Sequence, residues 1–395
     1  MKSNYKQLGQ FIRQVDVRNS EGKEENLLGV SVQKQFIQSI ANTVGTDFTK
    51  YKVVKKGQFT YIPDTSRRGD KIAIALLEDY EEGLVSNVYT VFEIIDEKQL
   101  IPEYLMLWFS RPEFDRYARF KSHGSVREIF DWNELCMVEL PVPDIEKQRK
   151  IVKAYKTITD RIALKQKIND NLVACIDTIF NEQFGNFKAL AESSTANTDF
   201  SSLPDGWTIE NAVHSFDISI GKTPPRSEPE WFTSNQTDNV WISIADMKTN
   251  SPFIFKSAEY LTNEAVKKHN VKIVPANSVL LSFKMTVGRV AIVTNEVTTN
   301  EAIAHFPCTK ENLFFVYCYL KNFNYGYLGS TSSITTAINS KIIKEMPFLM
   351  PSKKELDLFN HKVSGLFEQL KYISKELDIL EELSKMLLPQ LLGHC

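Results

Sequence analysis

The sequence predicts a mixed α/β (α+β) fold with two similar domains, each followed by a long amphipathic helix. An irregular, strand-rich stretch, a proline-containing exit and a long helix occur twice in the same order, with exits LPVPDIEKQ at 140–148 and FLMPSKKEL at 348–356. Both helices carry apolar residues at the three- and four-residue steps of a coiled coil. Two like halves in one chain indicate a pseudo-twofold molecule that presents two similar surfaces.

Residues 1–143 form the first predicted domain. Alternating, β-branched and aromatic residues predict strands within 51–62, 71–77 and 85–95, with glycines between them. A helix is predicted over 101–120, and Pro112 can interrupt it because proline removes a helical hydrogen bond. The second predicted domain, 207–351, repeats this order with strands within 271–284, 289–293 and 300–306 and a helix over 312–323. A Gly-Ser segment follows in each copy.

Two long helices are predicted over 144–184 and 352–395, and the Ser- and Thr-rich segment 185–206 is predicted to be an exposed linker. In the first helix, a six-residue step between Ile162 and Ile168 predicts a local unwinding or a shift of face. In the second, Ser384 is the one polar gap. The seam there consists of Val363, Leu366, Leu370, Ile373, Leu377, Leu380, Leu387 and Leu391.

The length of these helices favours pairing. A helix of roughly 38 residues spans about 57 Å, which is more than a small domain needs for its own core. We therefore expect the two helices to form an antiparallel coiled coil that acts as a spacer between the domains. The alternative is that each helix packs only onto its own domain.

The bulk composition is that of a soluble globular protein. The chain has 395 residues, 43% hydrophobic and 24% charged, and neither its N-terminus nor any later window predicts a membrane span. The five cysteines are scattered without a CxxC pair, and the histidines are dispersed, so neither disulfides nor a zinc site are predicted. A cytoplasmic protein without a membrane partner is expected.

No catalytic motif is recognisable. The chain lacks a phosphate-binding GxxxxGK[ST] loop, a GxGxxG turn and a GxSxG elbow. Asp64, Asp96 and Lys98 can be combined into a nuclease-like pattern, but such patterns arise often by chance. GKTPPR at 221–226 lacks the preceding Asn or Asp and the following aromatic residue of an amino-methyltransferase motif. The sequence therefore predicts no catalytic residues.

Cationic and polar loops of the first domain are suited to contact with nucleic acid. Arginine can donate two hydrogen bonds to guanine, whereas lysine, serine and backbone amides reach phosphates. The alternative is that these residues are ordinary solvated surface charges. The loop at 121–127 is the strongest candidate. The first-domain candidates are Lys55, Lys56, Arg67, Arg68, Lys121, His123, Ser125 and Arg127.

The second domain has comparable loops. Two prolines stiffen 221–226, Gly288 lies in a turn, and 331–336 is rich in hydroxyls that can donate to phosphates. An ordinary Ser- and Thr-rich connector is the alternative reading of the last segment. The second-domain candidates are Lys222, Thr223, Arg226, Lys284, Thr286, Arg289, Thr331, Ser332 and Ser333.

In their order, these segments resemble the specificity (S) subunit of type I restriction-modification systems, over essentially the whole chain. The markers of the first half are SNVYTVF at 86–92, the step from Gly124 to Arg127 followed by Trp132, and LPVPDIEKQRKI at 140–151. Those of the second half are LPDGW at 203–207, GKTPPR at 221–226 and MTVGRVAIV at 285–293. The second exit departs from the pattern, because it has Leu356 where the first has Gln148.

The resemblance implies a non-catalytic subunit of a host-defence system that reads a bipartite double-stranded DNA target. Each target-recognition domain would read one half-site, and the helices would set the unread spacer. Two methyltransferase (M) subunits, carrying S-adenosylmethionine and methylating adenine N6 in flipped bases, would dock on it. Restriction/motor (R) subunits would join for the cleavage of unmodified DNA. S-adenosylmethionine, Mg and ATP are expected only on the partner subunits, and no cofactor or metal on this chain.

Two other classes remain open. A coiled-coil adaptor whose domains bind proteins predicts no sequence-dependent DNA binding, even with partners present. An enzyme, either a nuclease or a lone methyltransferase, predicts Mg-dependent cleavage or S-adenosylmethionine binding by the isolated chain. For the DNA-binding interpretation, the net charge of -2 is compatible only if basic loops are segregated from acidic helices, or if a partner subunit supplies positive potential.

Overall fold

The computed structural model describes residues 5–39, 45–65, 71–123, 128–193, 200–201, 203–248, 251–328 and 338–392. The chain divides into two compact units: unit 1 is Met1–Arg161 with Glu381–Cys395, and unit 2 is Ile162–Leu380. Each boundary falls inside a long helix, so both helices contribute to both units.

Unit 1 is built on a four-stranded antiparallel sheet of order β2-β9-β6-β7. Its strands are β2 Ile12–Val15, β6 Phe59–Tyr61, β7 Ile74–Leu76 and β9 Thr90–Ile94. Three two-stranded ladders accompany the sheet, formed by β1 Tyr5–Gln7 with β10 Glu139–Pro141, β3 Leu28–Val30 with β4 Phe36–Gln38, and β5 Lys52–Lys55 with β8 Glu82–Val85. Short 3-10 turns lie at Leu8–Gln10 and Phe48–Lys50.

Aromatic side chains fill the core of unit 1. Phe59 and Phe92 on neighbouring strands stack with ring centroids 4.9 Å apart, and Phe109 meets the edge of both rings. Helices α1 Pro102–Phe109, α2 Pro112–Lys121 and α3 Trp132–Cys136 add further side chains to this core. Pro112 begins α2 and the preceding Arg111 is extended, so the helix predicted over 101–120 is broken at Pro112.

Unit 2 contains a five-stranded sheet of order β12-β20-β17-β18-β15 and a four-stranded sheet of order β13-β16-β14-β19. The first consists of β12 Ser219–Ile220, β15 Phe253–Ile254, β17 Ser278–Ser282, β18 Val290–Val293 and β20 Ile303–Pro307. The second consists of β13 Phe232–Thr233, β14 Asn239–Ile242, β16 Glu259–Leu261 and β19 Thr298–Thr299. The remaining pieces are β11 Thr208–Asn211, β21 Pro347–Met350, α5 Ala212–Ser215, α6 Asn263–Lys268, α7 Leu313–Asn322, α8 Ser340–Glu345, and 3-10 turns Pro229–Trp231 and Tyr325–Leu328.

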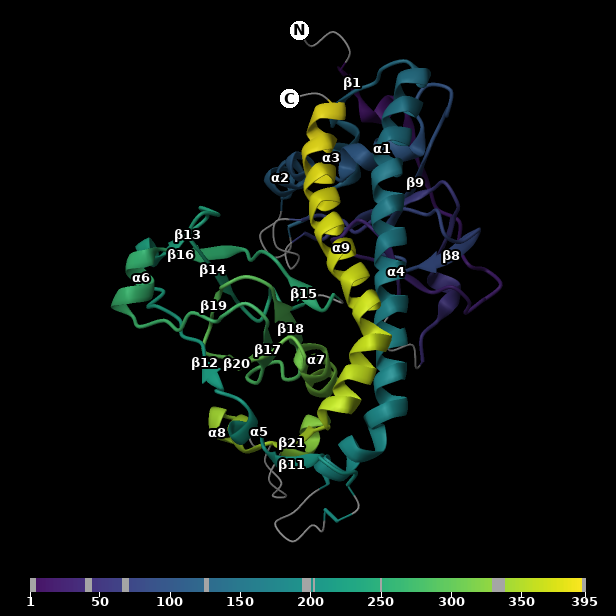
Figure 1. Ribbon diagram of the computed structural model, residues 1–395. Helices are drawn as coiled ribbons and strands as arrows, with labels where there is room; N and C mark the ends of the chain where they lie inside the picture. The colour runs from purple at the N-terminus through teal and green to yellow at the C-terminus, as the bar shows by residue number, and fades with distance from the viewer. Residues whose placement is uncertain are drawn as a thin grey trace. The chain divides into compact units, whose positions relative to one another are not determined.

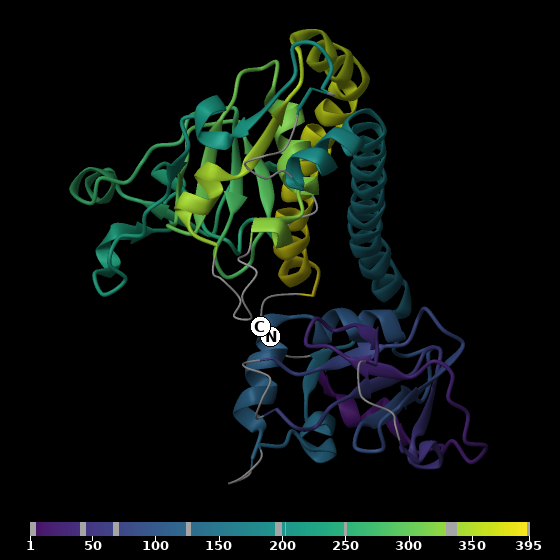
Figure 2. The same cartoon turned by 90° about the horizontal axis from the view of Figure 1, so that it is seen from below.

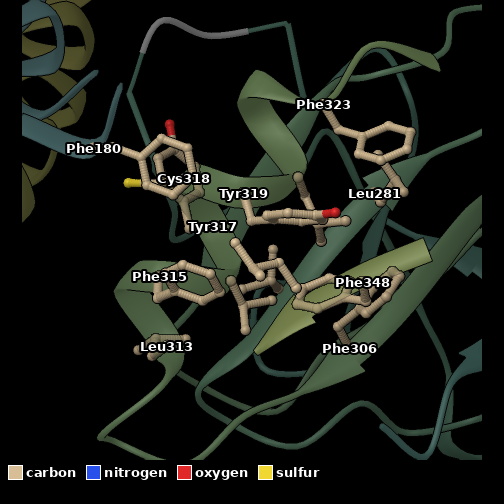
Figure 3. Close-up of a cluster of buried hydrophobic side chains, with 14 of the residues drawn as sticks. Phe180, Leu281, Phe306, Leu313, Phe315, Tyr317, Cys318, Tyr319, Phe323 and Phe348 are labelled. Atoms are coloured by element: carbon tan, nitrogen blue, oxygen red, sulfur yellow. The ribbon is translucent and has the colours of Figure 1, made fainter. Parts of the chain in front are cut away.

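The main core of unit 2 lies between the five-stranded sheet and α7. Leu281 and Phe306 from the sheet meet Phe315 and Tyr319 from the helix (Figure 3), and all four are fully buried. Helix α9, Lys353–Leu392, closes the other side of α7, where Phe314 and Phe367 stack at 4.1 Å. Figure 2 shows α9 in yellow beside the green strands of unit 2.

The two units repeat one structural device, which supports the predicted duplication. In each, an early strand pairs antiparallel with the strand that precedes a long helix: β1 with β10, and β11 with β21. In each, a tyrosine of the main helix donates a 2.9 Å hydrogen bond to a proline carbonyl of that second strand: Tyr104 to Pro141, and Tyr319 to Pro347. The shared device fixes the exit into the long helix.

The long helices α4, Ile145–Glu192, and α9 pack together within each unit (Figure 1). In unit 1, Ile151 of α4 and Leu388 of α9 join one core, and Ser384 donates a 3.3 Å hydrogen bond to the Tyr155 hydroxyl. In unit 2, Phe184 of α4 meets Phe359 of α9. The helices also pack onto the domain cores, but because they contact each other, the alternative that each helix packs only onto its own domain is wrong.

Two details of the predicted helices are wrong. Helix α4 continues to Glu192, so the segment predicted as a linker from 185 begins within the helix. The six-residue step does not unwind α4, which is helical throughout, so unwinding is the wrong one of the two outcomes predicted for this step. Lys165 lies in the seam between Ile162 and Ile168 and forms a 2.8 Å ion pair with Glu376 of α9. Lys165 thus occupies the seam position at which the sequence pattern has no apolar residue. Among the described residues, no helix is both long and apolar enough to span a bilayer.

Candidate nucleic-acid interface

A close backbone approach fixes the start of the GKTPPR loop in unit 2. The Gly221 amide donates to the Ile303 carbonyl at 3.1 Å, and the Lys222 amide donates to the Thr299 carbonyl at 2.9 Å. A Cβ on Gly221 would overlap Thr299 and the Asn300 carbonyl, so only glycine fits there. The loop that carries Lys222, Thr223 and Arg226 therefore leaves the sheet at a fixed position.

Arg226 is held by neighbours within unit 2. Its guanidinium donates two hydrogen bonds to the Glu259 carboxylate, at 2.6 and 2.8 Å. It also lies over the rings of Phe232 and Trp241, at 3.9 and 4.9 Å from their centroids. The hydrogen bond from Arg226 is the main cause that lowers the pKa of Glu259. In this arrangement Arg226 stiffens its loop rather than presenting a free fork to a base.

Glu301 connects the GKTPPR loop with the hairpin loop 283–289 between β17 and β18. Burial acts to raise the pKa of its carboxyl, but the Thr223 hydroxyl, its own backbone amide and the charges of Lys284 and Arg226 together lower it. The carboxylate of Glu301 is therefore bonded by one residue of the GKTPPR loop, Thr223, and also feels the charge of Lys284 in the hairpin loop. The structure thus brings together candidates from two separate predicted loops.

The hairpin loop 283–289 is anchored from inside. The Ser282 hydroxyl is buried, donates to the Thr286 carbonyl at 2.6 Å and accepts from the Arg289 amide at 3.0 Å. The Arg289 guanidinium donates to the Ile244 carbonyl at 2.6 Å. Arg289 therefore supports the loop, whereas Lys284 and Thr286 are exposed at its tip.

Lys55 and Lys56 of unit 1 lie at the turn between β5 and β6. The Lys55 amide donates to the Gln58 side chain at 2.8 Å, and the Lys56 ammonium pairs with Glu81 at 2.8 Å. That hydrogen bond is the main cause that raises the pKa of Lys56. Both side chains are exposed, and the contacts described for them do not include the other candidates of unit 1.

Lys121 and His123 lie at the end of α2 and share one carboxylate. Glu134 of α3 is 3.5 Å from the Lys121 ammonium and 3.7 Å from His123 Nε2. The Asp131 carboxylate accepts a hydrogen bond from the Glu134 amide, which caps the start of α3 and so helps to place the Glu134 side chain. Lys121 and His123 therefore lie beside the same carboxylate, and their predicted contact with nucleic acid stays a prediction.

Several predicted site residues lie outside the described residues. These are Arg67, Arg68, Ser125, Arg127, Thr331, Ser332 and Ser333. Among the residues that the structure describes, no group of three His, Cys, Asp or Glu side chains is placed to bind a metal ion. What the described geometry offers is a set of exposed donors on anchored loops, which suits binding.

The acidic partners of these cations were not predicted. Glu259 is 33 residues from Arg226, and Glu301 is 78 residues from Thr223. No local pattern connects residues so far apart, and only the strand pairing brings them together. Among the described candidates, Lys56, Lys121 and Arg226 each pair with a carboxylate, so an anion approaching them would compete with that carboxylate.

The family assignment follows from the duplicated layout and a direct comparison. A family model described as the type I restriction modification DNA specificity domain matches residues 10–174 and again 215–385. The chain belongs to this family. The two matched segments of the specificity family each run from early strands of one copy into its long helix, so they follow the repeat seen in the structure.

Curated members of the specificity family align over most of the chain. The HindI type I restriction enzyme specificity subunit of Haemophilus influenzae is 24% identical and covers 87% of this chain and 87% of its own length. The MjaIX specificity subunit of Methanocaldococcus jannaschii is 23% identical over 75% of this chain and 70% of its own length. Among solved structures, the S subunit of a type I restriction-modification system from M. genitalium has a TM-score of 0.56 at 14% identity, covering 99% of this chain and 96% of that one. That likeness shows a shared fold.

Proposed function

We propose that this chain is the non-catalytic subunit that gives a type I restriction-modification complex its DNA specificity. Each unit reads one half of a bipartite double-stranded target through its candidate loops. Two adenine-N6 methyltransferase subunits and the restriction/motor subunits dock on the chain and supply the chemistry. S-adenosylmethionine, Mg and ATP belong to those partners.

The duplication is the observation that carries this proposal. Both copies end their strand-rich part with the same strand pairing and the same tyrosine-to-proline hydrogen bond, then continue into a long helix. A protein with two like surfaces matches a target with two readable parts. The family comparison supports the same conclusion, because the match to the specificity domain also occurs twice.

The first experiment maps methylated adenines on random DNA after co-expression of the chain with methyltransferase subunits encoded beside it. We expect two short conserved half-sites at a constant separation, each containing or facing a methylated adenine. Methylation without sequence preference would contradict the proposal. A complex that assembles but binds no DNA selectively would instead support the adaptor alternative.

A second experiment tests the spacer role of the helices. One heptad is inserted into α4 after Arg161 and one into α9 after Leu380, so that the paired seam keeps its register. Seven helical residues add about 10 Å, or about three base pairs, to the unread gap. We expect a wider gap with both half-sites unchanged. A seven-residue insertion in the exposed loop after Gln236 is the control and should leave the gap unchanged; an altered half-site with the old gap would contradict the spacer role.

A further inference from the structure

One apolar side chain of the hairpin loop 283–289 has no role in the anchoring described above. Met285 is 99% exposed, although methionine is usually a buried residue. Its φ of 58° lies in the left-handed region that L residues rarely adopt. The Thr286 amide donates to the Lys284 carbonyl at 2.6 Å, so Met285 is the central residue of a strained three-residue turn. Exposure and backbone strain both oppose stability here.

The surrounding structure holds this turn in place. Ser282 is fully buried, and its carbonyl accepts a 2.9 Å hydrogen bond from the Gly288 amide. Gly288 has a φ of 88° and lies against the Tyr325 ring, which is 3.2 Å from where a Cβ would be. The Tyr325 hydroxyl in turn donates to the Leu320 carbonyl at 2.7 Å. The hairpin tip is therefore supported by α7 through Tyr325, and the backbone that carries the exposed Met285 side chain is held in place.

The groups on either side of Met285 indicate what it faces. Lys284 precedes it and Thr286 follows it, and both are exposed. The charge of Lys284 acts on the Glu301 carboxylate, which is bonded to Thr223 of the GKTPPR loop. The Lys284 ammonium and the Thr286 hydroxyl can both donate hydrogen bonds to phosphates. The Met285 thioether between them can instead pack against an apolar surface of a ligand whose phosphates lie on either side. The methyl group of thymine and the ring faces of bases are such surfaces.

We propose that Met285 is a specificity-determining residue that makes an apolar contact with a nucleobase in the half-site read by unit 2. This inference rests on the proposed function. The contacted surface is the C5 methyl of a thymine or a ring face exposed by partial unstacking. The supported turn positions the side chain before binding, so little conformational entropy is lost on contact.

The test uses the complete chain assembled with its methyltransferase subunits and a duplex carrying the mapped target. Met285→Gly removes the side chain and relieves the left-handed strain, Met285→Asn tolerates this backbone but is polar, and Met285→Leu keeps an apolar side chain. We expect Met285→Gly and Met285→Asn to lose roughly tenfold in affinity for the target relative to unrelated duplexes. Met285→Leu should stay within about threefold of the wild type.

Ile273→Ala is the matched control. Ile273 is an apolar residue of unit 2 that is 45% exposed and precedes β17, whereas Met285 follows that strand. Ile273 and Met285 thus lie beyond opposite ends of β17, whose five residues span about 17 Å. We expect target affinity to be unchanged. An equal loss in Ile273→Ala and Met285→Gly would overturn the inference, because exposed apolar surface in general would then be responsible.

Modified duplexes identify the contacted surface. If the thymine methyl is contacted, replacing that thymine by uracil weakens wild-type binding and has no further effect on Met285→Gly. If a ring face is contacted, 2-aminopurine at the step becomes more fluorescent with the wild type and not with Met285→Gly. No response to either replacement would overturn the inference.

Two failures are distinguishable. If the wild-type complex selects no DNA sequence, the proposed function fails and this inference fails with it. If the wild type selects its target and Met285→Gly selects it equally well, only the inference about Met285 fails. An equal loss on target and unrelated duplexes also overturns it, because a contact with a base must depend on sequence.

Discussion

The side-chain oxygen of Gln148 accepts a 3.0 Å hydrogen bond from the backbone amide of Ile101. The side-chain nitrogen of Gln148 donates at 2.8 Å to the carbonyls of Gln99 and Pro143, and the residue is fully buried. These bonds join the first turn of α4 to the start of α1. The second exit has Leu356 at the corresponding place, buried in the apolar core of unit 2. The same junction is thus polar in one copy and apolar in the other.

Replacing Gln148 by leucine should destabilise unit 1. The substitution imitates the second copy but leaves the Ile101 amide and two carbonyls buried without their partner, and we expect a loss of about 3 kcal/mol in the free energy of unfolding. Urea unfolding followed by tryptophan fluorescence measures it. Lys147→Leu, at the exposed neighbouring position, is the control and should change the free energy by less than about 0.5 kcal/mol. Equal effects of the two substitutions would show that the polar junction is not stabilising.

Stability should fall in mild acid because of His305. Its ring is fully buried, with Ser219 Oγ at 2.9 Å from Nδ1 and Thr299 Oγ1 at 2.7 Å from Nε2. Burial, with a smaller effect of Lys272, lowers the pKa of His305 from 6.5 to about 4. Between these pH values the unfolded chain binds a proton that the folded chain does not, so the contribution to stability is complete above pH 6.5 and is lost as pH falls towards 4.

The loss in the free energy of unfolding that His305 causes between neutral pH and pH 4 is roughly 3 kcal/mol at most. Urea unfolding of the wild type and of His305→Gln at a series of pH values between 7.5 and about 4 would measure it. The variant loses stability at neutral pH, because its hydrogen bonds change, but its stability should depend less steeply on pH. Parallel pH profiles for the two proteins would show that His305 is not the group responsible.

Gly221→Ala should both destabilise unit 2 and displace the GKTPPR loop. The added methyl group overlaps Thr299 of β19 and the Asn300 carbonyl that follows it, and this backbone cannot move without disturbing the sheet, so we expect a loss of about 3 kcal/mol. Gly365→Ala is the control of opposite sign. A Cβ there has no atom within 4 Å, and alanine favours the helix over glycine by about 1 kcal/mol. A stable Gly221→Ala variant with normal target selection would contradict the close approach.

The sequence predicted what depends on local periodicity. The strand-rich order, the break at Pro112 and the seam of α9 all follow from patterns within a few turns of chain, and each is present. The position of Lys165 was missed because counting apolar residues ignores a charged side chain with a partner on another helix. The candidate loop at 221–226 was found from its prolines and cations, but its pairing with Glu259 depends on β-sheet pairing over long sequence separations. Met285 was missed because its exposure depends on the turn.

The seam pair of Lys165 and Glu376 should be weakly but measurably coupled. The side chains are 26% and 27% exposed and lie 2.8 Å apart, so their attraction is only partly screened. A double-mutant cycle with Lys165→Met and Glu376→Gln should give a coupling of roughly 0.5–1 kcal/mol. The exposed pair Arg149 and Glu146 on α4 provides the comparison and should give about zero. A coupling no larger at the seam than on the surface would mean that Lys165 only fills space there.

Substitutions of Arg226 and Glu259 separate a positioning role from a base contact. If Arg226 stiffens its loop through Glu259, then Arg226→Lys and Glu259→Gln remove the same two-pronged bond and should weaken target binding to a similar extent, about tenfold. If Arg226 instead leaves Glu259 to bind a base, Glu259→Gln should strengthen binding, because it frees the guanidinium, while Arg226→Lys weakens it. Affinities of the assembled complex for target and unrelated duplexes distinguish the two. We expect the first pattern, since both bonds from the guanidinium go to the Glu259 carboxylate and the rings of Phe232 and Trp241 add to its hold on the loop, so that Arg226 is a support rather than a free donor.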